Sequence, residues 1–144
     1  MKKFTIFILA VSFSWTLSAQ TWDGGGNGTS WNDPMNWDND QIPAVNDLVE
    51  FSTADTIIVT GTAANAPAKV GVSLGTTVIL NLDLSIGDGS AAQHGIVVGA
   101  NSVLVLGFPG TNRTFTMNGP NNKDGITVFA SGNAANIGIA NSTT

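Results

Sequence analysis

The sequence predicts an all-β protein built as a short stack of parallel β-coils, and three observations lead to this prediction. Short runs of β-branched and aliphatic residues recur along the chain, each bounded by turn formers such as Gly, Asn, Asp or Pro. After the first twenty residues, no apolar stripe at helical spacing lasts two turns. Within the runs every second residue is apolar, so we expect one face of each strand to point inward.

The expected strands are mostly three to five residues long, and their spacing suggests a solenoid. They lie at Thr56–Thr60, Val70–Val72, Thr77–Leu82, Leu84–Ile86, Ile96–Val98, Val103–Leu106, Thr114–Met117, Gly125–Phe129 and Asn136–Ile139. Alternate apolar pairs recur at separations of 20 and 22 residues, a period typical of solenoids. These pairs are Leu84/Ile86, Leu104/Leu106 and Ile126/Val128.

Stacking the three pairs would bury one continuous aliphatic row, in about four coils of two or three strands each. An antiparallel sandwich is the competing architecture. It would have longer strands joined by two-residue hairpin turns, which this spacing does not favour.

The first nineteen residues have the three parts of a secretory signal. Lys2 and Lys3 form the basic end, an apolar stretch runs from Phe4 to Phe13, and small residues precede a cleavage site after Ala19. A retained membrane anchor is the alternative, but the stretch is shorter than the roughly 20 apolar residues of a membrane span. We therefore expect a signal peptide at 1–19, an N-terminal cap at 20–52 and the coils at 53–144.

The expected mature chain is acidic and contains no cysteine. It keeps Lys69, Arg113 and Lys123 against ten acidic residues, which gives a formal net charge of −7. Because a phosphate backbone is repelled by such a charge, we expect no nucleic-acid partner. Without disulfides, stability must come from packing and backbone hydrogen bonding, which favours a regular fold with a continuous core.

A motif rich in tryptophan and glycine occupies residues 22–51. It reads W-D-G-G-G-x-G-x-x-W-x-x-x-x-N-W from Trp22 to Trp37, followed by P-x-x-x-D-x-V-x-F from Pro43 to Phe51. The motif resembles the opening segment of bacterial surface proteins with autotransporter-type, adhesin-like β-helical repeats. The resemblance implies a right-handed parallel β-helix whose coils follow the motif directly, and it implies no particular activity.

Four aromatic residues of the motif are expected to cover the open end of the first coil. They are Trp22, Trp31, Trp37 and Phe51. Large rings can cover such an end with few residues, and the glycines between the first two tryptophans allow a tight loop. Exposed tryptophans also stack on sugar rings, so contact with a glycan is the alternative role for the same residues.

Calcium is the metal for which the sequence offers ligands. Asp33, Asp38, Asp40 and Asp47 are carboxylates close together in the chain, and carboxylates suit a hard cation. Neither an EF-hand spacing nor a Gly-Gly-x-Gly-x-Asp repeat accompanies them. We therefore expect no cofactor, with a structural calcium at the cap as the alternative.

Groups suited to catalysis are sparse in the coils. His94 is the only histidine, and it lies in an expected turn without an acid or base partner in the sequence around it. We therefore expect an inert histidine and no enzymatic activity.

Together, these features predict an exported structural or adhesin-like protein, extracellular or on the outer-membrane surface, without catalytic activity. Candidate partners are host or environmental glycans and surface proteins. Because no polar or aromatic cap follows the strand at Asn136–Ile139, end-to-end self-association or continuation into a longer chain is a further expectation. The alternative function is a carbohydrate-binding or polysaccharide-degrading β-helix, which would require an aromatic or charged groove.

Overall fold

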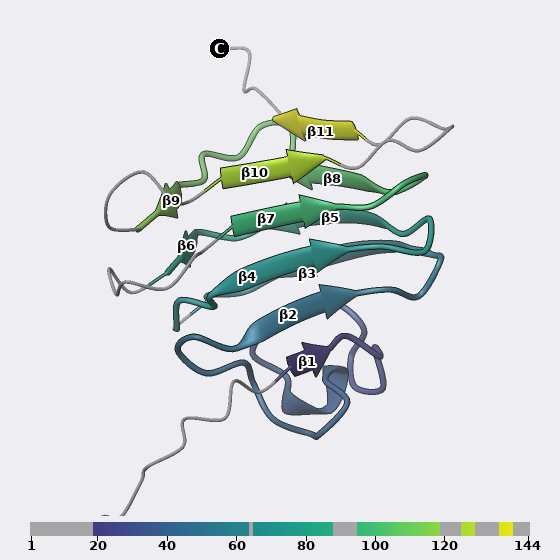
Figure 1. Ribbon diagram of the computed structural model, residues 1–144. Helices are drawn as coiled ribbons and strands as arrows, with labels where there is room; N and C mark the ends of the chain where they lie inside the picture. The colour runs from purple at the N-terminus through teal and green to yellow at the C-terminus, as the bar shows by residue number, and fades with distance from the viewer. Residues whose placement is uncertain (1–18, 64, 88–94, 119–124, 129–135, 140–144) are drawn as a thin grey trace, which may run out of the picture.

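The computed structural model describes residues 19–63, 65–87, 95–118, 125–128 and 136–139 of the 144-residue chain (Figure 1). These ranges contain eleven strands and one short 3-10 helix, η1 (Pro34–Asn36). All strand pairs of the three sheets are parallel. The prediction of an all-β protein with parallel strands is confirmed.

The strands are divided among three sheets. The first sheet consists, in order, of β1 (Ala19–Thr21), β2 (Leu48–Phe51), β4 (Lys69–Val72), β7 (Gly95–Val98) and β10 (Gly125–Val128). The second consists of β3 (Thr56–Thr60), β5 (Thr77–Asn81), β8 (Val103–Leu106) and β11 (Asn136–Ile139). The third pairs β6 (Leu84–Ile86) with β9 (Phe115–Met117).

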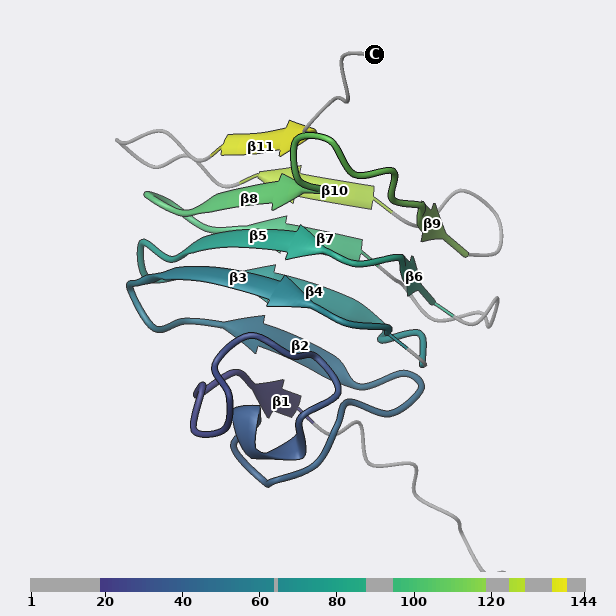
Figure 2. The same cartoon turned by 180° about the vertical axis from the view of Figure 1, so that it is seen from behind.

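The chain visits these sheets in rotation. Strands β2, β4, β7 and β10 lie one above another on one side of the molecule (Figure 1), and β3, β5, β8 and β11 lie on the opposite side (Figure 2). Four residues connect β2 to β3, β4 to β5 and β7 to β8. Each of these connections has a residue in the left-handed region, namely Ala54, Leu74 and Asn101 with φ of 60°, 55° and 61°. The connections therefore turn the chain sharply from one sheet into the next.

Neighbouring strands pair in register, so that like side chains stack in rows. In the first sheet, Val49 pairs with Val70 and Val70 pairs with Ile96. In the second sheet, Val78 pairs with Leu104. All five side chains are buried, and they belong to one hydrophobic cluster between the sheets. This arrangement satisfies the backbone groups along the stack and removes the inward aliphatic rows from water.

The predicted register of the coils is wrong. Leu84 lies in the third sheet, where it pairs with Phe115. Leu104 lies in the second sheet, and Ile126 lies in the first, where it pairs with Ile96. The three apolar pairs that were expected to stack on one another therefore belong to three different sheets.

The physical reason is that the stretches of chain between paired strands differ in length. From Val49 the in-register partners of the first sheet follow at intervals of 21, 26 and 30 residues, at Val70, Ile96 and Ile126. The intervals grow because the chain returns from the second sheet to the first by longer paths. The path from β5 to β7 includes β6, and the path from β8 to β10 includes β9. A constant period could not find this register.

The positions of the strands are predicted better than their register. Strands β3, β6, β8 and β11 have the expected bounds, and β4, β5, β7, β9 and β10 differ from them by one residue. Strands β1 and β2 were not among the expected strands, since both lie in or beside the segment expected as a cap. Because β1 pairs with β2 and β2 with β4, the first sheet continues without a break from this segment into the strands that follow it.

Residues 22–47 wind across the end of the stack at which β1 lies (Figures 1 and 2). Trp22 and Trp37 form an isolated antiparallel bridge, and Ser30 and Thr60 form a parallel one. Of the expected signal segment, only Ala19 is among the described residues. Within the described part of the chain, no helix has the length and apolar character needed to cross a membrane.

Candidate functional site

The four aromatic residues of the motif form one cluster at the N-terminal end of the stack. The ring centroid of Trp37 lies 5.0 Å from those of Trp22 and Trp31, and in both pairs the rings meet edge to face. The ring centroid of Phe51 lies 5.7 Å from that of Trp22 and 6.0 Å from that of Trp37. Such edge-to-face pairs stabilise beyond their buried area, so the cluster packs firmly against the first inward rows.

The burial of these rings bears on the two roles that the sequence left open, a cap and contact with a glycan. Trp31, Trp37 and Phe51 are 0% exposed, and Trp22 is 3% exposed. Stacking on a sugar requires an open ring face, which none of the four offers. The burial of the four rings agrees with a cap, and glycan contact by these residues stays an untested alternative.

A buried asparagine that was not among the predicted site residues organises the loop around the cluster. Asn36 is 0% exposed, and its Oδ1 accepts hydrogen bonds from the backbone N–H groups of Gly26 and Gly28, at 3.1 and 2.8 Å. Its Nδ2 donates to Asn27 Oδ1 at 3.1 Å and to the Ser30 carbonyl at 2.9 Å. In the sequence, the Asn36-Trp37 pair of the motif is the signal that could have indicated an asparagine holding this loop.

The four candidate calcium ligands serve separate loops. Asp33 accepts hydrogen bonds from the backbone N–H of Met35, at the start of η1, and from that of Asn27, in the glycine-rich loop at residues 24–28, at 3.1 and 2.9 Å. Asp38 accepts one from β1 at 3.1 Å, and Asp47 accepts one within its own turn at 2.7 Å. Asp40 lies in a turn, with φ of 51°. Across the described residues, no group of three or more His, Cys, Asp or Glu side chains could hold a metal.

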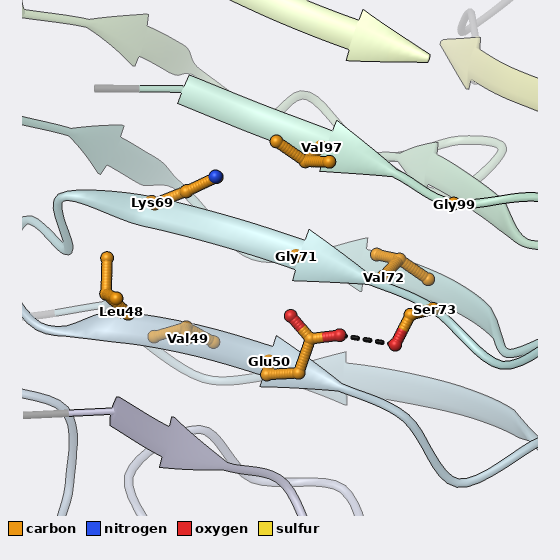
Figure 3. A pocket seen from close by; sticks show the side chains of 9 residues that line it. All are labelled: Leu48, Val49, Glu50, Lys69, Gly71, Val72, Ser73, Val97 and Gly99. Carbon is orange, nitrogen blue, oxygen red and sulfur yellow. Dashed lines mark hydrogen bonds between the residues drawn. The ribbon is translucent and has the colours of Figure 1, made fainter. Parts of the chain in front are cut away.

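His94 lies outside the described residues, so its expected inertness stays a prediction. A second polar region can be located, however, on the outer face of the first sheet. It is a hollow of about 210 Å³ that spans β2, β4 and β7 (Figure 3). Its lining residues are Leu48, Val49, Glu50, Lys69, Gly71, Val72, Ser73, Val97 and Gly99.

The hollow exists because glycine replaces a side chain in the middle of the sheet. Gly71 pairs with Glu50 on β2 and with Val97 on β7, and all three lie at outward positions. The Glu50 carboxylate leans over Gly71 into the space that a side chain there would fill, and a Cβ at residue 71 would overlap it. Gly71 therefore sets both the depth of the hollow and the position of the carboxylate.

A hydroxyl group holds this carboxylate in place. The Ser73 Oγ–H donates to Glu50 Oε1 (Figure 3). Glu50 Oε2 and the Lys69 ammonium have no hydrogen-bond or ion-pair partner within the described residues. Leu48 is 37% exposed at the edge of the hollow, and Val97 is half-buried. The hollow thus combines a free acceptor and a free cation with an apolar surface.

A second hollow, of about 200 Å³, lies beside the third sheet. Polar groups that line it already form hydrogen bonds within the protein. There, Asp83 Oδ1 accepts a hydrogen bond from the Thr114 N–H at 2.7 Å, and Ser85 Oγ accepts one from Asn118 Nδ2. Since these groups already bind one another, the hollow on the first sheet is the better candidate binding site.

The predicted site residues do not include Glu50, Lys69 or Ser73. An isolated glycine between Val70 and Val72 in an otherwise apolar strand is the signal that could have found this site, because such a glycine marks a close approach to the backbone. The charged residues alone carry no such signal.

Comparison with known proteins adds no relative. No family model matches this chain, no curated protein matches it, and no solved structure matches it. The resemblance of the motif to adhesin-like surface proteins therefore stays a prediction, and the function has to be argued from the geometry.

Proposed function

We propose that this chain folds as a right-handed parallel β-helix and acts as an exported structural or adhesin-like module of the cell surface, without catalytic activity. The observation that carries the proposal is the in-register stacking of parallel strands, in which Val49, Val70 and Ile96 follow one another through the first sheet. A stack of this kind forms a rod that displays its outer faces in regular rows.

The path of the chain supports the right-handed sense. In Figure 1, β2 runs to the right on the near side, and Figure 2 presents β3 running to the right when seen from behind. The stack rises from β2 to β10 in both views. A near strand directed to the right, a far strand directed to the left and an upward rise describe a right-handed turn, which is the usual sense of parallel crossovers.

The outer face of the second sheet supports a role in display. Ile58 pairs with Ile79, and Ile79 with Val105, so the three outward side chains form one row. Ile58 is 40% exposed, and the other two are half-buried. An uncharged row on a regular sheet is a rigid surface on which a partner can dock without displacing ordered charges.

Export and surface location are supported by the sequence. The basic end, apolar stretch and small residues before Ala19 favour secretion, and the motif from Trp22 to Phe51 resembles that of adhesin-like surface proteins. The buried tryptophan cluster fits the same role, because a rod exposed to the environment needs a sealed end.

Antibodies against the folded protein provide the test, applied to intact and to permeabilised cells of the bacterium that encodes it. The proposal predicts that intact cells are labelled and that protease added outside removes the signal. An abundant periplasmic protein serves as the control for cell integrity. Labelling that appears only after permeabilisation, with full protection from protease, would contradict a surface role.

A further inference from the structure

We propose that the hollow over Gly71 is a binding site for a neutral hydroxylated ring, such as one hexopyranose unit of a polysaccharide. The inference goes beyond the structural role proposed above, and that role stands or falls independently of it. Three properties of the hollow carry the inference: its free polar groups, its apolar surface and its size.

The polar groups require a ligand that both donates and accepts hydrogen bonds. Glu50 Oε1 is occupied by the Ser73 hydroxyl, which leaves Oε2 as an acceptor over Gly71. Lys69 lies two residues before Gly71 on the same face and offers ammonium donors. A hydroxyl donates one hydrogen bond and accepts others, so a hydroxylated ring carries the donors that Glu50 requires and the acceptors that Lys69 requires.

The apolar part of the hollow suits the C–H face of such a ring. Leu48 and Val97 present aliphatic surface at its edges, and no side chain rises from Gly71 or Gly99 (Figure 3). A ring can therefore lie with its C–H face toward this aliphatic lining and its polar edge toward Glu50 and Lys69, beside the Glu50 carboxylate that covers Gly71. None of the residues that line the hollow is aromatic, and Trp22, Trp31 and Trp37 are buried at the end of the stack.

Size and charge narrow the class of ligand further. A volume of about 210 Å³ is below the range of roughly 300–1,000 Å³ that is usual for drug-sized ligands, so it suits a single ring. An anionic ligand would meet the Glu50 carboxylate and the negative charge of the whole chain. A cationic ligand would meet Lys69. A neutral polyol satisfies both charged groups without either repulsion.

Amide chemical shifts of the ¹⁵N-labelled mature protein provide the test, recorded during titration with methyl glycosides of glucose, galactose and mannose. For at least one of them we expect saturable shifts at residues 48–50, 69–73 and 97–99. The expected Kd is on the order of 1–10 mM, because a single ring makes few polar contacts.

Gly71→Ala is the decisive variant. Gly71 does not adopt a positive φ, so the backbone admits alanine, and the obstacle is the flexible end of Glu50. The added methyl group takes the space that the Glu50 carboxylate occupies and displaces this acceptor, so the saturable shifts should disappear while the rest of the spectrum is retained. Lys69→Met should weaken binding about tenfold, because it removes a charged donor and keeps the aliphatic stem.

Thr77→Ala, on the outer face of the second sheet and outside the Ile58 row, is the control and should bind as the unchanged protein does. Absence of shifts with all three glycosides would overturn the proposal, as would shifts that survive in Gly71→Ala. Free glycine is the comparison ligand: if it produced the same shifts and the glycosides did not, the site would take a zwitterion and the proposal would be wrong.

Discussion

Trp37 donates its indole Nε1–H to the backbone carbonyl of Trp31 at 3.0 Å, and both side chains are fully buried. The Nε1–H of Trp31, in contrast, has no hydrogen-bond partner within the described structure. Of these two neighbouring tryptophans, only Trp37 therefore adds a hydrogen bond to the stability of the cluster. The difference gives a sensitive test of the cluster.

The first prediction compares Trp37→Phe with Trp31→Phe. Both substitutions shrink a buried ring, but only Trp37→Phe removes a hydrogen bond, whereas Trp31→Phe removes a buried donor that has no partner. We expect Trp37→Phe to lower the free energy of unfolding by about 1–3 kcal/mol more than Trp31→Phe does, measured by urea denaturation. Equal losses, or a larger loss in Trp31→Phe, would show that the indole hydrogen bond is not formed.

The second prediction concerns Asn36, which makes four hydrogen bonds inside the glycine-rich loop. Asn36→Ala removes all four hydrogen bonds and leaves partly buried backbone groups without these partners, and we expect it to lower the free energy of unfolding by about 3 kcal/mol. Asn39→Ala is the matched control, since Asn39 is exposed and bonds only to Asp38. If the two variants unfold at the same urea concentration, Asn36 does not organise the loop.

The third prediction tests the direction of the side chains in β8. Leu104 is 0% exposed, while its neighbour Val105 points outward and is half-buried. Leu104→Ala should cost about 2–5 kcal/mol of stability because it opens a cavity in the core. Val105→Ala should cost about 1 kcal/mol or less. A reversed order of the two melting temperatures would mean that the strand presents its other face to the core.

The fourth prediction concerns the connection between β4 and β5. The hydroxyl of Thr76, which is fully buried, accepts from the Ala54 N–H at 3.1 Å and donates to the Ser73 carbonyl at 2.7 Å. Thr76→Val keeps the shape and removes both bonds, so we expect a loss of about 1–3 kcal/mol. Thr77→Val, one residue later at an outward position, should leave the thermal unfolding temperature nearly unchanged. If both variants unfold at the same temperature, the Thr76 hydroxyl does not stabilise the connection between β4 and β5.

Alternation along the chain was sufficient to predict the strands, because each strand buries every second side chain whatever its neighbours are. The cluster of aromatic rings was also accessible, since Trp22, Trp31 and Trp37 stand out in a chain with few other large residues. The register between paired strands could not be predicted from the sequence. It depends on how far the chain travels between sheets, and the connections that follow β3, β5 and β8 differ in length.

The candidate site was hidden for a related reason. Glu50 and Lys69 are 19 positions apart in the sequence and become diagonal neighbours only when β2 pairs with β4. Their free polar atoms matter because Gly71 leaves room above the backbone. Composition shows the charges and the glycine, but not that they meet on one face.

The central claim is that parallel strands stack in the register Val49, Val70 and Ile96 in one sheet, and Ile57, Val78 and Leu104 in the other. Methyl-to-methyl nuclear Overhauser effects on a methyl-labelled sample test it most directly. The account predicts cross-peaks between Val70 and Ile96 and between Val78 and Leu104. Absence of both cross-peaks, or a pattern of antiparallel strand pairs, would contradict it.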